Sequence, residues 1–229
     1  MKLTVIGRYG PYAKSGSHAA SCYLVSQGET NLVMDMGPGS MSRLTEGIDI
    51  EKISAVFISH LHYDHTSDLL AFRYRLEELN LKIRIITQTD DTPWCSVLLD
   101  HPLFEVIPVK AGDEINIGDF KLTFYDMNHT VPCLAVRIEG EKTLVYTGDT
   151  MYNDNIITAA RGADLLLADT SKPAGFKGPH MNVEIAKELS AKLGIRILST
   201  HLSPGYDPQP DLADCPSAQV AREGREYEI

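Results

Sequence analysis

The segment 59–65, SHLHYDH, constrains this chain more than any other feature. It places four side chains that bind metals within six residues: His60, His62, Asp64 and His65. The run before it is short, apolar and rich in branched residues, which predicts a buried strand. A polar turn that happens to be rich in histidine is a poor alternative, because the chain has only 8 histidines in 229 residues. The sequence therefore predicts metal ligands at the end of a strand, a usual place for a site on a rigid scaffold.

The spacing of these four side chains divides them between two directions. Residues two apart point to the same side of an extended backbone, so His60, His62 and Asp64 align while His65 points elsewhere. One short segment can thus offer two imidazoles to one metal ion, and a carboxylate plus an imidazole to a second.

Three further candidates each follow an apolar strand. His129 follows KLTFYDMN, Asp149 follows TLVYTG, and His201 follows IRILST. Each residue alone is more typical of a loop or a helix cap. Their shared position at strand ends, together with the histidine cluster, favours a common site.

Hydrophobic periodicity and turn residues predict strands first, followed by strands mixed with helices. The predicted strands are 2–6, 21–26, 31–35, 53–58, 83–87, 104–108, 113–117, 119–126, 133–139, 143–147, 164–169 and 195–200. The predicted helices are 38–46, 66–80, 93–100, 154–161 and 181–193. Gly118-Asp119 predicts a hairpin between the two strands that it joins. The tail after Pro204 is expected to be mostly irregular, with a closing strand at 225–229.

The length of 229 residues suits one domain, 1–229. The apolar fraction of 43% and the charged fraction of 23% are typical of an ordinary globular protein. No run approaches the ~18 apolar residues of a membrane span, so no membrane partner is expected. The N-terminal segment is a predicted strand, too short for the apolar core of a signal peptide. We therefore expect a cytoplasmic protein.

The net charge of −10 argues against a groove for long nucleic acid, which needs clustered Lys and Arg. A small anionic substrate remains compatible, because bound divalent metals can dominate the local field. The four cysteines form no CxxC pair, so neither a zinc ribbon nor a thioredoxin-type motif is predicted. We expect reduced thiols, and Cys133 either packs in the core or approaches the site near His129.

The ordered set of motifs resembles the metallo-β-lactamase superfamily over nearly the whole chain. The motifs are SHLHYDH, then His129, then TGDT at 147–150, then STHLSP at 199–204. The resemblance implies an α+β fold of four layers, an αββα sandwich. Two mixed sheets would pack face to face, with helices outside and the site at one edge.

The resemblance also implies a set of seven metal ligands. One ion would be held by His60, His62 and His129, the other by Asp64, His65 and His201, with Asp149 as the bridge. A bridging aspartate in place of a cysteine is more similar to hydrolases of phosphodiesters, thioesters and lactones than to the antibiotic-degrading β-lactamases.

Imidazole and carboxylate ligands suit two divalent ions, zinc first, with manganese or iron as alternatives. Two such ions about 3.5–4 Å apart can share a water and lower its pKa. The expected nucleophile is therefore a metal-bridging hydroxide, which Asp64 could orient. Asp35 fits two roles equally, a hydrogen-bond acceptor behind a ligating imidazole or a structural turn aspartate.

Closer features resemble the ribonuclease Z branch, namely HTVP from His129, ADT at 168–170 and PHMN at 179–182. In that branch a carboxylate supports a histidine that assists the leaving group. Here these residues are Asp169, where a longer Glu is usual, and His180, the expected general acid. A cap position before the helix is the alternative for His180. His129 and Asp149 are only 20 positions apart, which leaves no room for the tRNA-gripping arm of that branch.

The sequence therefore predicts a metal-dependent hydrolase of small phosphodiesters, such as cyclic nucleotides or short nucleotide esters. Hydrolysis of carboxyl esters, lactones or thioesters at the same site is the alternative, and a non-catalytic metal-binding or sensing protein is a third. A homodimer is expected only by analogy. The 171–180 loop is either a lid or a plain surface connection, and His18 either lines the pocket or lies on the surface.

Overall fold

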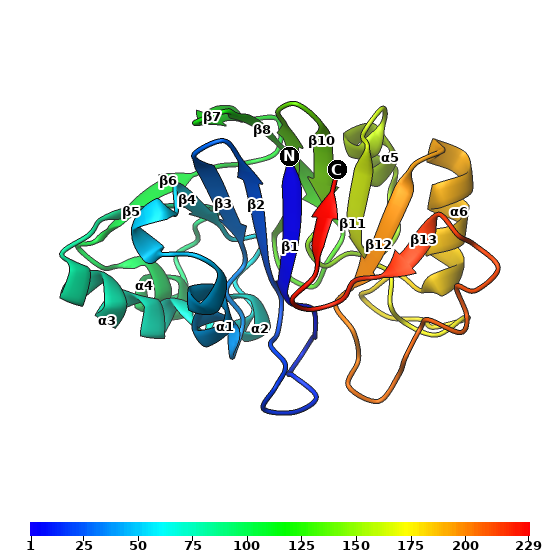
Figure 1. The fold of residues 1–229 in the computed structure, drawn as a ribbon, viewed down its shortest axis with the longest axis horizontal. Coiled ribbons are helices and arrows are strands. Elements are labelled where there is room, and N and C mark those ends of the chain that lie inside the picture. Colours follow the sequence, from blue (N-terminus) through cyan, green and yellow to red (C-terminus); the bar gives the residue numbers. More distant parts are fainter.

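Two seven-stranded sheets pack face to face in the computed structural model, which describes residues 1–229 (Figure 1). The first sheet contains, in spatial order, β14 (Glu226–Glu228), β1 (Lys2–Gly7), β2 (Cys22–Gln27), β3 (Thr30–Met34), β4 (Ala55–Phe57), β5 (Ile83–Thr87) and β6 (Phe104–Pro108). The second contains β13 (Ala218–Val220), β12 (Arg196–Thr200), β11 (Leu165–Asp169), β10 (Thr143–Tyr146), β9 (Cys133–Glu139), β8 (Phe120–Met127) and β7 (Glu114–Ile117). Neighbours from β3 to β6 and from β10 to β13 are parallel, and the others are antiparallel. Both sheets are therefore mixed, as predicted.

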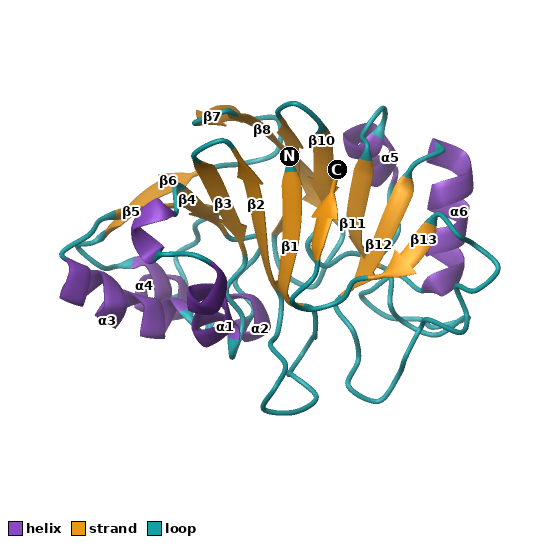
Figure 2. Cartoon of the chain, viewed as in Figure 1, coloured by secondary structure: helices purple, strands orange, loops and turns teal.

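Helices cover the outer faces of both sheets (Figure 2). Beside the first sheet lie α1 (Ser40–Gly47), α3 (Leu69–Leu79) and α4 (Pro93–Leu99), and beside the second lie α5 (Asp154–Ala160) and α6 (Val183–Leu193). A single helical turn, α2 (Tyr63–Thr66), and a 3₁₀ helix at Ile50–Lys52 complete the regular structure. The four layers confirm the predicted αββα sandwich.

Alternation along the strands builds three hydrophobic layers between the four structural layers. In β4, Phe57 faces the second sheet, where its ring centroid lies 5.6 Å from that of Phe124, whereas Val56 packs in the core under the helices. In β11, Leu167 belongs to the central core and Leu166 to the core beneath α5 and α6. A strand that is covered on both faces has an almost continuous apolar sequence, which is why these segments could be identified from the sequence.

The directions of the strands bring the predicted ligands to one edge of the sandwich. β8 and β10 both pair antiparallel with β9 and so run the same way, and β11 and β12 continue this direction in parallel. The residues just after β8, β10 and β12, which are His129, Asp149 and His201, therefore emerge at the same edge.

The backbone differs from the prediction at the histidine cluster. The backbone is extended at His62 and then turns into α2, so Asp64 and His65 lie on a helical turn. The Thr66 hydroxyl donates to the His62 carbonyl (2.9 Å), and the Met36 N–H donates to the His65 carbonyl (2.8 Å). These bonds fix the turn, and the expected extended alignment is wrong beyond His62.

Element boundaries change as well. The predicted helix 66–80 begins only at Leu69, as α3, after the separate turn α2, and the predicted strand 53–58 is reduced to β4. Strand β13, which pairs only with β12, was not predicted. Its three residues are too few to show a periodic pattern. β14 lies within the predicted closing strand 225–229. None of the helices combines the length and the apolar character of a membrane-crossing segment.

Candidate metal centre

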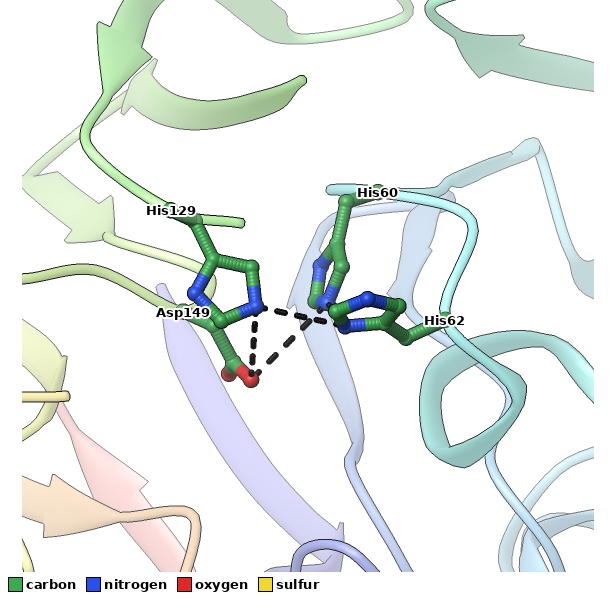
Figure 3. A group of neighbouring side chains, drawn as sticks. All are labelled: His60, His62, His129 and Asp149. Carbon is green, nitrogen blue, oxygen red and sulfur yellow. Dashed lines mark hydrogen bonds and ion pairs between the residues drawn. The ribbon is translucent and has the colours of Figure 1, made fainter. Parts of the chain in front are cut away.

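All seven predicted ligands converge in two groups of four. The first group is His60, His62, His129 and Asp149 (Figure 3), and the second is Asp64, His65, Asp149 and His201. Within each group the candidate donor atoms lie within 4.8 Å of one another. Asp149 belongs to both groups, which is the position expected of a shared ligand.

In the first group, nitrogen atoms of three imidazoles face one another (Figure 3). His60 Nε2 and His129 Nε2 lie 3.1 Å and 3.2 Å from His62 Nδ1. Asp149 Oδ2 lies 3.8 Å from Nε2 of both His60 and His129. An ion that binds nitrogen or oxygen at about 2.0–2.2 Å spaces tetrahedral ligands roughly 3.3–3.6 Å apart. The observed separations therefore suit one metal ion.

In the second group, two carboxylates face two imidazoles. His201 Nε2 lies 3.2 Å from Asp64 Oδ2 and 3.1 Å from Asp149 Oδ2. His65 Nε2 lies 3.3 Å from Asp149 Oδ1, yet both of these buried atoms lack a hydrogen-bond partner. A divalent cation would satisfy both atoms, so the residues present fit a second metal ion.

The outer nitrogens of three imidazoles contact fixed acceptors. His65 Nδ1 donates to Asp35 Oδ2 (2.7 Å), and His129 Nδ1 donates to a backbone carbonyl (3.1 Å). The Ser59 hydroxyl donates to Asp35 Oδ2 (2.9 Å) and so accepts from His60 Nδ1 (3.0 Å). In the neutral imidazole these bonds would hold the proton on the outer nitrogen and leave the inner nitrogen for a metal ion, as metal-bound histidines require.

Burial and the nearby charges act in opposite directions on the pKa values of the site. Burial lowers the pKa of His60 well below its usual value, and nearby His65 adds to this effect. Burial also opposes a charge on His65, but Asp149 and Asp35 outweigh it and raise the pKa of His65 well above its usual value. Burial opposes ionisation of Asp149, but His201 and His65 hold the pKa of its carboxyl well below the usual range. The central carboxylate is therefore ionised, as a cation site requires.

The backbone adopts an uncommon conformation at two residues of the site. Asp35 and His201 both have a φ of 60°, the left-handed region that residues other than glycine seldom occupy.

Gly10 lies directly against the His201 ring, and a Cβ atom on Gly10 would stand 2.0 Å from His201 Nε2. The Leu202 N–H donates to the Arg8 carbonyl (2.8 Å), which holds the two segments together. Only glycine fits at position 10, and the close contact fixes the His201 ring.

A further carboxylate–imidazole pair lies beside Asp149. His180 Nδ1 donates to Asp169 Oδ2 (2.7 Å) and lies 3.8 Å from Asp149 Oδ2. Asp169 is buried and also accepts from the Thr150 N–H (3.2 Å), whereas the His180 side chain is 16% exposed. Asp169 is shorter than the Glu that is usual in the ribonuclease Z branch, but it still reaches His180, its predicted partner. The bond to Asp169 uses Nδ1 and leaves the second ring nitrogen, Nε2, without a hydrogen-bond partner.

The family model described as a beta-lactamase superfamily domain matches residues 30–201, which include every candidate ligand and the Asp169–His180 pair. The chain belongs to the β-lactamase superfamily. It is 32% identical over 213 residues to the probable metallo-hydrolase YhfI of Bacillus subtilis, a match that covers 88% of this chain and 87% of YhfI. It is 31% identical over 132 residues to ribonuclease Z of Methanopyrus kandleri, covering 57% of this chain and 47% of that enzyme.

Solved structures of the superfamily agree with the fold. The crystal structure of Bacillus subtilis YhfI matches with a TM-score of 0.90 at 28% identity, covering 100% of this chain and 98% of YhfI. A diphosphatase of the PhnP family matches with a TM-score of 0.78 at 18% identity, covering 100% of this chain and 97% of the diphosphatase. The predicted superfamily and its ribonuclease Z-like relatives are confirmed, and the chain is a metallo-hydrolase.

Two other predicted features lie outside the ligand groups of this superfamily member. His18 pairs with Glu223 and lines a separate cavity of about 510 Å³, which contains none of the candidate ligands. Cys133 packs in the core between the second sheet and its helices and also approaches the site, where its thiol lies against the Asp149 backbone; burial, followed by the charge of Asp149, raises the pKa of the thiol well above the usual value. Cys133 is thus a neutral core residue, and all four cysteines are free.

The 171–180 loop is anchored at both ends and exposed between them. Lys172 Nζ donates to the Ser203 hydroxyl (2.7 Å), and the Pro179 carbonyl accepts from His129 Nδ1 (3.1 Å). Residues 173–177 are exposed. The end of the loop therefore belongs to the site, whereas its middle is a surface connection.

One supporting residue of the site was not identified from the sequence. The Tyr146 hydroxyl donates to Asp35 Oδ2 (2.6 Å), although Tyr146 lies on β10 and the two residues are 111 positions apart. Alternation along β10 places Tyr146 in the central core, but no local pattern indicates its partner. Asp35 directly follows β3 and accepts from His65 Nδ1, which is the first of the two roles considered from the sequence.

Replacing Asp35 with Asn is expected to lower both stability and metal affinity. Asp35 Oδ2 accepts from Ser59, His65 and Tyr146, and an amide NH₂ in its place cannot accept. Breaking a buried charged network in this way costs about 3–5 kcal/mol of unfolding free energy. Metal affinity should fall roughly 10–100-fold. Urea unfolding of the metal-free protein and metal titration measure the two effects.

Asp68→Asn is the matched control for this substitution. Asp68 accepts from the Met41 N–H (2.8 Å) and contacts no histidine, so the change should leave metal affinity as it is. Wild-type metal affinity in Asp35→Asn would show that Asp35 does not orient a ligand.

Proposed function

We propose that this metallo-hydrolase cleaves small phosphodiesters and that two divalent metal ions, zinc first among the candidates, occupy its site. The observation that carries the proposal is the Asp169–His180 pair, with His180 Nδ1 3.8 Å from Asp149 Oδ2. An alkoxide is a poor leaving group from phosphorus and needs a proton. A histidine held through Nδ1 by a buried carboxylate can supply it from Nε2.

In this proposal each ligand group holds one ion. The first ion would be held by His60, His62 and His129, the second by Asp64, His65 and His201, and Asp149 would be shared. Neutral imidazole and carboxylate oxygen suit zinc, and also manganese and iron. When bound, the ions supply the Lewis acidity that activates water and stabilises charge on the phosphate.

The chain's own residues would position the reacting groups. Asp64, a buried carboxylate that can only accept hydrogen bonds when ionised, would orient the attacking water. His180 is stacked on His201, with ring centroids 4.8 Å apart, and is bonded to Asp169. These two contacts would fix the orientation of the proton donor.

The short connection between His129 and Asp149 supports a small substrate. Only β9 and β10 lie in this interval, so no protruding arm is inserted there. The net charge of −10 also disfavours long nucleic acid. Two similar proteins, the PhnP-family diphosphatase and the ribonuclease Z, are named for cleavage at phosphate, which supports this chemistry.

Turnover of two matched chromogenic substrates by the metal-loaded protein tests the proposal. Bis-p-nitrophenyl phosphate and p-nitrophenyl acetate release the same product, one from phosphorus and the other from a carbonyl carbon. After correction for the uncatalysed rates, we expect phosphodiester turnover to dominate. Asp64→Ala should lower it roughly 100-fold or more, because the metal site supplies several kcal/mol of transition-state stabilisation.

The other outcomes identify the alternatives. Dominant ester turnover that Asp64→Ala also abolishes would assign the site to carboxyl esters, lactones or thioesters. Metal binding without turnover of either substrate would overturn the phosphodiesterase proposal.

A further inference from the structure

A cavity of about 420 Å³ opens beside the first ligand group. Its lining includes the candidate ligands His60 and His62, together with Leu61, Gln88, Trp94, Val131 and Pro132. The volume lies within the range of roughly 300–1,000 Å³ that is usual for ligand pockets. Because two candidate ligands form part of the wall, a group bound here would lie directly beside the metal centre.

Trp94, the only tryptophan of the chain, forms a fixed wall of this cavity. Its Nε1 donates to the Leu61 carbonyl (2.8 Å) inside the ligand-bearing segment, while 38% of the residue stays exposed. The residue lies in the first turn of α4, where Pro93 begins the helix and the Thr92 hydroxyl accepts from the Cys95 N–H (3.2 Å). The indole is therefore held in place with part of its surface free.

The exposed surface of the cavity is mostly apolar, although Thr89, Thr92 and Thr130 also line it. No Lys or Arg contributes to it, and the one carboxylate, Asp90, accepts through Oδ1 from the N–H (2.9 Å) and the hydroxyl (2.5 Å) of Thr92. Gln88 Nε2 is buried and has no hydrogen-bond partner. An exposed indole surface and an unpaired amide favour a flat aromatic occupant with hydrogen-bond acceptors on its edge, rather than a phosphate or an alkyl chain.

We propose that this cavity binds the base of a nucleotide substrate, stacked on Trp94 and hydrogen-bonded to Gln88, with the phosphodiester at the metal centre. This inference rests on the proposed phosphodiesterase function and names its substrate class, phosphodiesters of nucleosides. Stacking on an aromatic side chain tolerates any base. Trp94 would therefore select nucleoside esters over simple alkyl esters without strong preference among bases.

The intrinsic fluorescence of the metal-loaded protein reports on this contact directly, because Trp94 is the only indole. Titration with adenosine 5′-monophosphate should quench the fluorescence in a saturable manner. Ribose 5-phosphate, which keeps the sugar and the phosphate but lacks the base, should not. The measurement needs no turnover, so its outcome is separate from that of the proposed function.

Substrate selectivity provides the second test. Thymidine 5′-p-nitrophenyl phosphate and methyl p-nitrophenyl phosphate share the scissile bond and differ only in the nucleoside. Trp94→Ala should lower the ratio of their kcat/KM values roughly 5–100-fold, the range for loss of one base–aromatic stack. Trp94→Phe should retain most of the ratio. Tyr74→Ala, which removes another exposed aromatic ring (76% exposed) from α3, is the control and should leave the ratio unchanged.

The outcomes distinguish failure of this site from failure of the proposed function. Hydrolysis of both phosphodiesters without quenching by adenosine 5′-monophosphate, or with an unchanged ratio in Trp94→Ala, would overturn the base site while leaving the phosphodiesterase proposal intact. Quenching in a protein that cleaves no phosphodiester would overturn the catalytic proposal and support base binding at Trp94.

Discussion

Replacing Asp149 with Asn is expected to release most of the bound metal and to lower phosphodiester kcat/KM roughly 1,000-fold or more. Asp149 contacts both ligand groups, with Oδ2 3.8 Å from His60 Nε2 in the first and 3.1 Å from His201 Nε2 in the second. Asparagine keeps the shape of the side chain but loses the negative charge, and its NH₂ cannot bind a cation. Both groups would lose their shared ligand in a single substitution.

Elemental analysis of metal per chain and steady-state kinetics measure the two effects. Asp164→Asn is the matched control, because Asp164 bonds to Lys142 Nζ (2.9 Å) and to the Thr143 N–H (2.8 Å), outside both ligand groups. It should retain wild-type metal content and turnover. An Asp149→Asn protein that retains two ions per chain and full activity would exclude Asp149 as the shared ligand.

The positions of the candidate ligands could be predicted because each follows a strand that is recognisable from its apolar residues. Apolar runs such as LLLAD in β11 are recognisable when a strand is covered on both faces, and the residue after such a strand lies at the sheet edge. His129, Asp149 and His201 meet for this reason. The alternate strands β8, β10 and β12 of the second sheet run in the same direction and carry them to the same edge.

The local geometry of the histidine cluster was harder to predict. Spacing alone placed His60, His62 and Asp64 on one side of an extended chain, but the backbone leaves that conformation after His62. The helical turn depends on a bond from Met36, which follows a different strand. Tertiary contacts thus overrode the local pattern, although the division of the ligands into two groups was kept.

The supporting residues depend on contacts between distant segments and leave no local signal. Tyr146 reaches Asp35 across the central core between the two sheets, and Trp94 reaches Leu61 from the start of α4. A lone tryptophan or a strand tyrosine is equally compatible with simple packing. Only the fold shows that one supports a candidate ligand network and the other lines a cavity beside it.

His180→Ala is expected to separate substrates by their leaving groups. Removing a general acid should slow hydrolysis of 3′,5′-cyclic AMP, which expels an alkoxide, roughly 100–10,000-fold. Bis-p-nitrophenyl phosphate should be much less affected, because p-nitrophenolate is a stable anion that leaves without a proton. Asp169→Asn, which weakens the support of Nδ1, should cause a smaller loss with the same dependence on the leaving group.

His101→Ala is the matched control, because His101 pairs with Glu77 (3.1 Å) and belongs to neither ligand group. Turnover of both substrates by each variant, with bound metal checked in every sample, completes the measurement. His180 also stacks on His201, so a purely structural role predicts equal losses on the two substrates and a lower metal content. That result would remove the proton donor from the proposal and with it the argument for phosphodiesters over carboxyl esters, whereas an alkoxide-selective loss at full metal content would assign the proton to His180.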